Sequence, residues 1–171
     1  LWEQWAGDPP ATLGKMLAGA EIAFADDRDF ALVLKTKFEN GDPHARRRLA
    51  AAAAFDAYPR LQRIACTLRV QESVADQALS AVMLTRGADG EVIETSTEAI
   101  HMTGVVDRVG GGDAFASGVL FGLWSGWSDQ DALEFGLAAA GLKHSVPGDF
   151  NLFTAAEVRA AMGDGGFDIR R

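Results

Sequence analysis

The chain has 171 residues, of which 48% are hydrophobic, and a formal net charge of −8 at pH 7. This composition predicts one domain with a hydrophobic core and excludes a disordered chain. The acidic charge argues against a nucleic-acid partner, and no apolar run approaches the ~18 residues of a membrane span. We expect a cytoplasmic protein without a signal peptide, in which the single cysteine, Cys66, fills the core in a reducing compartment.

The first half of the chain predicts short helices and strands that begin at acidic or proline-containing turns. Asp8 is the expected N-cap of the first helix, and Asp42-Pro43 opens a longer one that carries three consecutive arginines. A solvated helix face explains those arginines better than phosphate binding does. The expected elements are a helix at 9–18, a strand at 21–24, an acidic turn at 26–29 with helical residues 30–34, and a helix through residue 55.

The second half continues the alternation of strands and helices. Residues 70–79 are expected to be irregular, 87–90 to form a turn and 163–171 to be loose. Ser128 and Thr154 resemble the first residues of capping boxes. The expected elements are strands at 63–69, 81–85, 91–94 and 99–106, and helices at 114–124, 132–144 and from Thr154 to 162.

This alternation predicts an α/β fold with a parallel sheet covered on both faces. In such sheets, functional residues gather at the carboxyl ends of the strands. Thr67 to Arg69 and Asp107 to Asp113 are expected to lie at such ends.

A run of three glycines followed by Asp113 is the most informative stretch. Glycines let backbone N–H groups approach an anion, and a helix that begins there adds the positive end of its dipole. A carboxylate beside such an anion hole suits phosphoryl transfer to a hydroxyl group. An ordinary loop is the competing explanation, and the run matches neither the Walker A nor the Rossmann pattern.

Residues 107–118 read Asp-Arg-Val-Gly-Gly-Gly-Asp-Ala-Phe-Ala-Ser-Gly, which resembles the C-terminal signature of ribokinase-like carbohydrate kinases, the phosphofructokinase-B family. Residues 142–152, Leu-Lys-His-Ser-Val-Pro-Gly-Asp-Phe-Asn-Leu, resemble the tail of 2-dehydro-3-deoxygluconate kinases, and residues 67–69 and 80–84 resemble the same subgroup. The resemblance covers roughly residues 20–162. It implies a ribokinase-like three-layer α/β/α sandwich with a mostly parallel sheet.

The resemblance also implies which part of a kinase this chain would be, and which cofactors and partners it would bind. Residues 1–171 would be the C-terminal portion of one kinase domain, whose lid and most of whose sugar pocket belong to an N-terminal half. A complete short protein is the alternative. The implied cofactors are ATP and Mg²⁺, with a monovalent cation as a further candidate, and the implied partners are a small sugar acid and ATP. Neither a nucleic acid nor a membrane is expected as a partner, and homo-oligomerisation is left open.

The site residues implied by the resemblance fall into three groups. Asp113 is the general base, and the amides of Gly110, Gly111 and Gly112 hold the developing charge. Asp26 and Asp29 occupy the family's magnesium-organising positions, and Asp107 matches a monovalent-cation position. The residues implied to bind the nucleotide, its phosphates or the substrate carboxylate are Thr67, Arg69, Arg108, Lys143 and His144.

Several of these residues have simpler structural explanations. The acidic turn of Asp26 and Asp29 can cap a helix, and Arg69 can be a surface residue after a strand. Lys143 and His144 suit the negative end of a helix dipole. The four tryptophans are expected to be packing residues: Trp2, Trp5, Trp124 and Trp127.

Three functions are therefore open. The first is a kinase that phosphorylates the 6-hydroxyl of 2-dehydro-3-deoxy-D-gluconate, and the second is a kinase for another sugar, such as fructose or ribose. The third is a catalytically inactive α/β fragment. An in-frame upstream sequence with a Gly-Gly motif and a Tyr-Arg pair would support the kinases.

Overall fold

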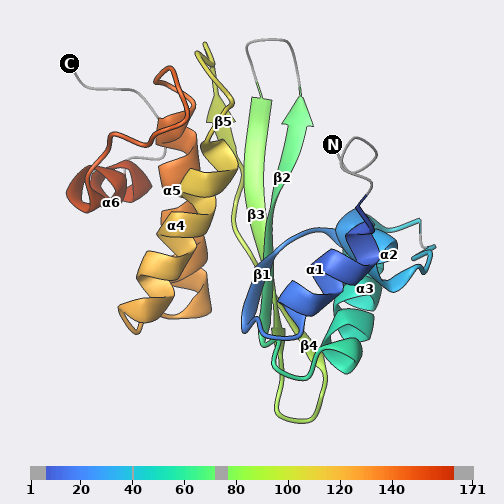
Figure 1. The fold of residues 1–171 in the computed structure, drawn as a ribbon. Coiled ribbons are helices and arrows are strands. Elements are labelled where there is room, and N and C mark those ends of the chain that lie inside the picture. The colour runs from blue at the N-terminus through green and yellow to red at the C-terminus, as the bar shows by residue number, and fades with distance from the viewer. Residues whose placement is uncertain (1–6, 40, 72–76, 164–171) are drawn as a thin grey trace. The chain divides into compact units, whose positions relative to one another are not determined.

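The computed structural model describes residues 7–39, 41–71 and 77–163 (Figure 1). The chain divides into two compact units, one made of Leu1–Cys66 with Met83–Glu94 and the other of Thr67–Val82 with Thr95–Arg171. Trp2, Trp5 and most of the expected loose tail lie outside the described residues. Among the residues described, no helix is both long and apolar enough to cross a membrane.

Helices of the first unit begin at aspartate caps, as the sequence predicts. The side chains of Asp8, Asp26 and Asp42 each accept hydrogen bonds from first-turn amides, which otherwise have no partner within the helix. The second helix starts inside the acidic turn, earlier than expected. The elements are α1 (Pro9–Leu17), β1 (Ile22–Phe24), α2 (Asp27–Leu34) and α3 (Pro43–Ala57).

The sheet is mixed, which corrects the expectation of a mostly parallel one. Its strands are β1, β2 (Arg63–Gln71), β3 (Gln77–Arg86), β4 (Val92–Ser96) and β5 (Ile100–Met102). The order is β1-β2-β3-β4, with β5 also on β3; β1 pairs parallel with β2, and β5 antiparallel with β3. Only five residues separate β2 from β3 and β3 from β4, which is too few for a parallel crossover.

The expectation of an irregular segment at 70–79 is wrong at both ends, because β2 reaches Gln71 and β3 begins at Gln77. Polar residues such as Gln77 obscured the strand pattern, although that side chain is only 1% exposed. Thr67 and Arg69 consequently lie within β2 rather than at its end.

Arg86, at the end of β3, contacts the C-terminal end of α3 within the first unit. Its guanidinium lies 5.0 Å from the ring centre of Phe55 and donates to backbone carbonyl groups. The acceptors are the oxygens of Phe55, Tyr58 and Leu61. Cys66 is partly buried in this unit, and burial raises the pKa of its thiol to about 11, so it stays protonated at neutral pH.

The second unit is built on two closely packed helices, α4 (Gly111–Trp124) and α5 (Asp129–Lys143), which lie side by side in Figure 1. Glycine permits this approach, since a Cβ on Gly118 would come within 2.8 Å of the Gly136 Cα atom. The shorter α6 (Ala155–Gly163) packs against α5, with Val158 in the shared core. These contacts bury nearly the whole length of α5.

Of the two tryptophans near the end of α4, one packs against other aromatic rings and the other is exposed. Trp127 contacts Phe121 and Phe135 at centroid distances of 5.6 and 5.4 Å, which confirms its packing role. The prediction for Trp124 is wrong, because this residue is 83% exposed. In the last turn of α4 its side chain lies in solvent, and the sequence pattern alone does not show which side chains of that turn are covered.

Candidate active site

The glycine run forms the start of α4. Gly110 is the N-cap, with a φ of 78° that disfavours other residues, and Gly111, Gly112 and Asp113 make the first turn. No side chain among the described residues caps this helix end. The Gly111 amide donates to the carbonyl oxygen of Arg108 at 3.4 Å, whereas the amides of Gly112 and Asp113 have no intrahelical partner and both residues are exposed. An open helix N-terminus with a carboxylate beside it can bind an anion and accept a proton.

Asp107 holds the loop that leads into this turn. Its Oδ1 accepts the amide of Val109 at 3.0 Å, and its Oδ2 accepts the amide of Gly148 at 2.9 Å. These two bonds, the one from Val109 above all, hold the pKa of Asp107 below its ordinary value. The carboxylate thus ties the glycine turn to the loop after α5, and a role in binding a monovalent cation stays a prediction.

The Pro-Gly-Asp-Phe segment packs directly on the glycine turn. A Cβ on Gly110 would lie 2.0 Å from the carbonyl oxygen of Asp149, so only glycine fits there. The carbonyl oxygen of His144 also accepts the amides of Val106 and Asp107, at 2.9 and 3.3 Å. The two sequence segments that carry the family resemblance therefore form one structure.

Basic residues that the sequence proposed for the nucleotide gather near this turn. Burial lowers the pKa of His144 most, and the charges of Arg69, Lys143 and Arg108 lower it further, outweighing the bond to Ala140. Partial burial, and then the charge of Arg108, likewise lower the pKa of Arg69. Arg69 and Arg108 are exposed and within reach of an anion.

Lys143 and His144 are placed differently from the expectation. Lys143 is 0% exposed and donates from Nζ to the carbonyl oxygen of Val146 at 3.1 Å. His144 is 3% exposed, so neither side chain is open to a ligand in this structure. Thr67 is partly buried on β2, two positions before Arg69 and on the same face of the strand.

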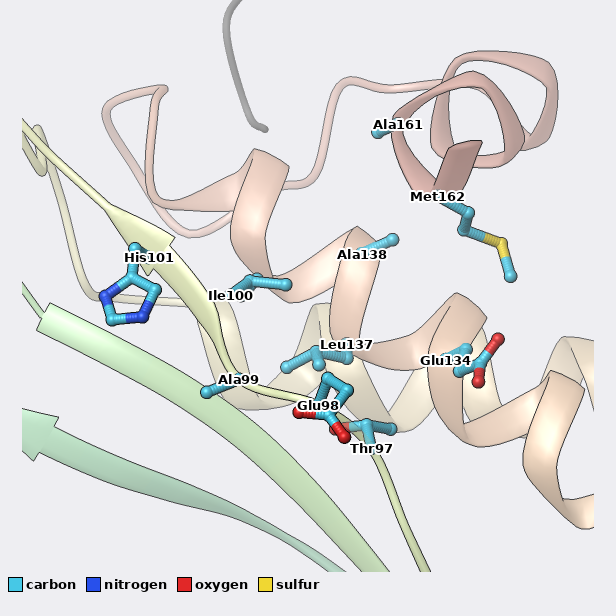
Figure 2. Close-up of a pocket in the computed structure, with 10 residues that line it drawn as sticks. All are labelled: Thr97, Glu98, Ala99, Ile100, His101, Glu134, Leu137, Ala138, Ala161 and Met162. Atoms are coloured by element: carbon cyan, nitrogen blue, oxygen red, sulfur yellow. The ribbon is translucent and has the colours of Figure 1, made fainter. Parts of the chain in front are cut away.

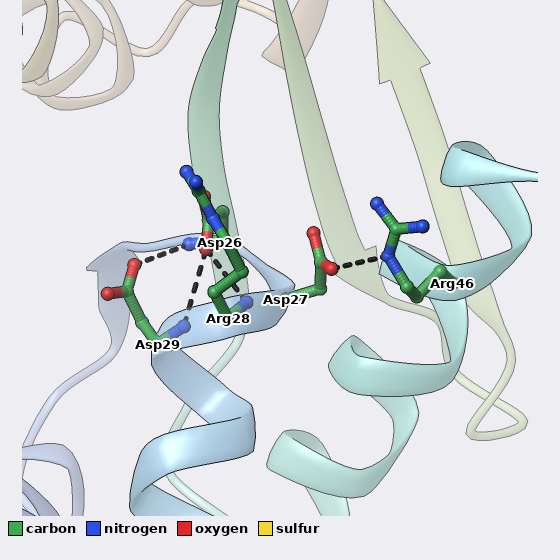
Figure 3. A network of polar contacts seen from close by, with 5 residues as sticks. All are labelled: Asp26, Asp27, Arg28, Asp29 and Arg46. Atoms are coloured by element: carbon green, nitrogen blue, oxygen red, sulfur yellow. Dashed lines mark hydrogen bonds and ion pairs between the residues drawn. The ribbon is translucent and has the colours of Figure 1, made fainter. Parts of the chain in front are cut away.

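Asp26 and Asp29 belong to the first unit, where they form the cap of α2 (Figure 3). Asp26 accepts the amides of Arg28 and Asp29, and Asp29 returns a bond to the Asp26 amide at 2.9 Å. Burial favours protonation of Asp26, but the bonds from Arg28 outweigh it and lower the pKa. Beside them, the buried Asp27 pairs with Arg46 of α3 at 2.5 Å.

These contacts confirm the helix-capping explanation, and the magnesium role stays a prediction. No cluster of three or more potential metal ligands occurs among the described residues. Two of the three consecutive arginines form ion pairs within the protein: Arg46 with Asp27, and Arg48 with Glu94 at 2.8 Å.

A pocket of about 570 Å³ lies within the second unit, beside α5 (Figure 2). Apolar side chains from the β5 segment, α5 and α6 form much of its wall, while Glu98 and Glu134 add carboxylates. Its lining residues are Thr97, Glu98, Ala99, Ile100, His101, Glu134, Leu137, Ala138, Ala161 and Met162. Sequence reasoning missed this pocket, because apolar spacing on a helix looks the same whether the face lines a pocket or a core.

A family model described as the pfkB family carbohydrate kinase matches residues 4–154. The match covers most of the chain and includes both the glycine turn and the loop after α5. The chain therefore belongs to the pfkB family of carbohydrate kinases, which confirms the resemblance seen in the sequence.

Relatives and solved structures agree with this membership. The chain is 35% identical over 103 residues to the 2-dehydro-3-deoxygalactonokinase of Haloferax volcanii, a match covering 57% of this chain and 32% of that protein. It is 36% identical over 92 residues to the 2-dehydro-3-deoxygluconokinase of Bacillus subtilis, covering 48% and 28%. An ATP-dependent 6-phosphofructokinase of Thermoanaerobacterium thermosaccharolyticum is 38% identical over 72 residues, covering 40% and 22%.

The crystal structure of a Thermotoga maritima 2-dehydro-3-deoxygluconokinase is similar, with a TM-score of 0.78 and 25% identity. That match covers 90% of this chain and 45% of the other. A pfkB family carbohydrate kinase from Listeria grayi gives a TM-score of 0.78 at 28% identity, covering 91% and 45%. The chain thus spans between 22% and 32% of the length of these curated relatives and 45% of the two solved chains.

Proposed function

We propose that this chain is the C-terminal portion of an ATP-dependent sugar-acid kinase that phosphorylates the 6-hydroxyl of 2-dehydro-3-deoxy-D-gluconate. One observation carries the proposal: exposed Asp113 stands in the first turn of α4, beside an uncapped helix end. The loop after α5 holds that helix end in place through Asp107 and Gly110.

In the proposed reaction, the hydroxyl oxygen of the sugar acid attacks the γ-phosphorus of ATP. The bond from that phosphorus to the bridging oxygen of ADP breaks, and the hydroxyl proton passes to the carboxylate of Asp113. The amides of Gly110, Gly111 and Gly112, with the α4 dipole, stabilise the charge on the transferring phosphoryl group. Arg69 and Arg108 orient the phosphates of ATP by charge-assisted hydrogen bonds.

The pocket beside α5 is the proposed site of the adenine base. Its walls, formed by Ile100, Leu137 and Ala138, suit a flat heteroaromatic ring, and the nearby carboxylates can accept the exocyclic amine. Leu137 lines the pocket, and His144, seven residues later at the end of α5, contacts the segment that leads into the glycine turn. About two turns of α5 therefore separate the pocket from the glycine turn. This assignment replaces Lys143 and His144 as direct contacts of the base.

Magnesium accompanies ATP in the proposed reaction and would neutralise phosphate charge. Asp26 and Asp29 supply the oxygen atoms that Mg²⁺ prefers, while the α2 cap and Arg28 engage both oxygens of Asp26 and one oxygen of Asp29. The magnesium role of the two aspartates stays a prediction, and no step of the mechanism is assigned to them.

A different sugar is the second candidate, and the similarity to a 6-phosphofructokinase favours keeping it. The comparison of substrates decides between them: ATP-dependent phosphorylation is measured with 2-dehydro-3-deoxygluconate, 2-dehydro-3-deoxygalactonate, fructose and ribose. We expect the highest kcat/KM for 2-dehydro-3-deoxygluconate. Turnover of fructose or ribose in its place would overturn the substrate, and no turnover of any of them by a longer in-frame product would overturn the kinase.

The assay is run on residues 1–171 and on any longer in-frame product of the gene. We expect little activity from residues 1–171 alone, because orientation and exclusion of water supply much of phosphoryl transfer. Full turnover by this chain would refute the assignment of the sugar pocket to another segment. In the active form, Asp113→Asn should lower kcat ~10²–10⁴-fold and leave ATP affinity unchanged, while the exposed Asp89→Asn serves as the control.

A further inference from the structure

His144 contacts the glycine turn through its ring. A Cβ built on Gly111 would lie 2.6 Å from the Cε1 atom of this imidazole, and 3.3 Å from each ring nitrogen. The Nδ1 atom is bonded to the carbonyl oxygen of Ala140 at 2.6 Å. The Nε2 atom is buried and has no hydrogen-bond partner in the described part of the chain. The ring is thus wedged between α5 and the first residue of α4.

The backbone of His144 also binds the segment that leads into this turn. Its carbonyl oxygen accepts the amides of Val106 and Asp107, just before the glycines. One residue therefore contacts the turn both where the chain enters it and where α4 begins. Close packing transmits a displacement of the ring to Gly111, because buried groups have little room to adjust.

The ring is also the wrong group to hold a phosphate. Because Nδ1 faces a carbonyl oxygen, it carries the proton in the neutral ring, and Nε2 is then an acceptor. Burial and the nearby cations lower the pKa of His144, which favours this neutral form. A buried acceptor does not bind an anion, yet it lies under the helix end where an anion is expected.

We infer that His144 is a positioning residue: its imidazole sets the place of Gly111, and through it the direction of the α4 first-turn amides and of Asp113. This inference rests on the proposed kinase function. It differs from the role that the sequence resemblance implies, in which His144 contacts the nucleotide. A displacement of about 1 Å in such a site can cost ~10²-fold in rate.

A double-mutant cycle between His144 and Gly111 tests the inference. His144→Ala is expected to lower kcat tenfold or more and to change the KM for ATP less than twofold. Gly111→Ala is expected to lower kcat at least as much, because its Cβ meets the ring. The double variant should recover part of the loss, since removal of the ring makes room for the methyl group. Ser125→Ala, at the other end of α4, should keep wild-type activity.

Other outcomes would overturn the inference. A large rise in the KM for ATP with kcat preserved would make His144 a nucleotide contact. Additive losses in the double variant would show that the ring does not set the place of Gly111. If His144→Ala lowered the melting temperature but kept a normal kcat in the folded protein, His144 would be a packing residue only. Gly41→Ala is the stability control, because its Cβ meets nothing within 4 Å and it lies outside the proposed site.

A second measurement separates this inference from the kinase proposal. The amide resonances of Gly112 and Asp113 are followed by NMR while inorganic phosphate is added to the wild type and the three variants. We expect phosphate-dependent shifts in the wild type, loss in each single variant and partial return in the double variant. These shifts do not depend on turnover, so they decide the positioning role even where no sugar is phosphorylated. Equal shifts in all four proteins would refute it.

Discussion

Gly110→Ala tests whether the loop after α5 shapes the glycine turn. Two separate costs are expected at this position. The first is the left-handed backbone, since a φ of 78° costs a non-glycine residue roughly 1–2 kcal/mol. The second is the collision with Asp149, whose carbonyl oxygen would lie 2.0 Å from the new Cβ. Overpacking of this kind costs about 1–3 kcal/mol.

Gly126→Ala separates the two costs, because Gly126 has the same φ of 78° and a Cβ there meets nothing within 4 Å. Gly110→Ala should therefore lose about 3 kcal/mol, and Gly126→Ala about 1.5 kcal/mol. For a protein of this size, these losses correspond to roughly 10 °C and 5 °C in Tm.

Thermal unfolding and urea titration measure both variants at one protein concentration. The difference between them, rather than either value, carries the test, since the shared φ cost cancels. Equal losses would refute the reasoning that Asp149 constrains Gly110. A change in the urea m-value would indicate that the variant also altered the unfolded or native ensemble.

Three further predictions concern the rest of the chain. Arg86→Met removes the donors to the carbonyl groups at the end of α3 and should cost roughly 2–3 kcal/mol in urea unfolding; a loss below 0.5 kcal/mol would contradict this. Burial favours protonation of Glu94, but the bonds from His44 and Arg48 outweigh it and hold its pKa below the ordinary 4.5. Glu94→Gln should therefore cost about 1 kcal/mol at pH 7, and the difference from wild type should vanish as the pH falls through the lowered pKa; a difference that persists at pH 2 would refute the charge-based explanation. Gly118→Val should destabilise the α4–α5 packing by more than 1 kcal/mol, measured by Tm against Gly112→Ala.

The sequence alone predicted the features that depend on neighbouring residues. Asp8, Asp42 and Ser128 cap helices as expected, because a cap is a bond between a side chain and an amide two or three residues away. The glycine run and the tail after α5 likewise identified the family, since each motif is a contiguous string of residues. The base role of Asp113 stays a prediction from that resemblance.

Tertiary structure decided what depends on residues far apart in the chain. It buried Lys143 and His144, exposed Trp124, and required glycine at position 110 because Asp149 packs against it. It also formed the pocket beside α5 from segments that the sequence does not connect. A local pattern specifies which face of a helix is apolar, but the partner that covers that face is set by the path of the whole chain. For that reason the sequence placed His144 at the right helix end, and only the folded chain directs its ring at Gly111.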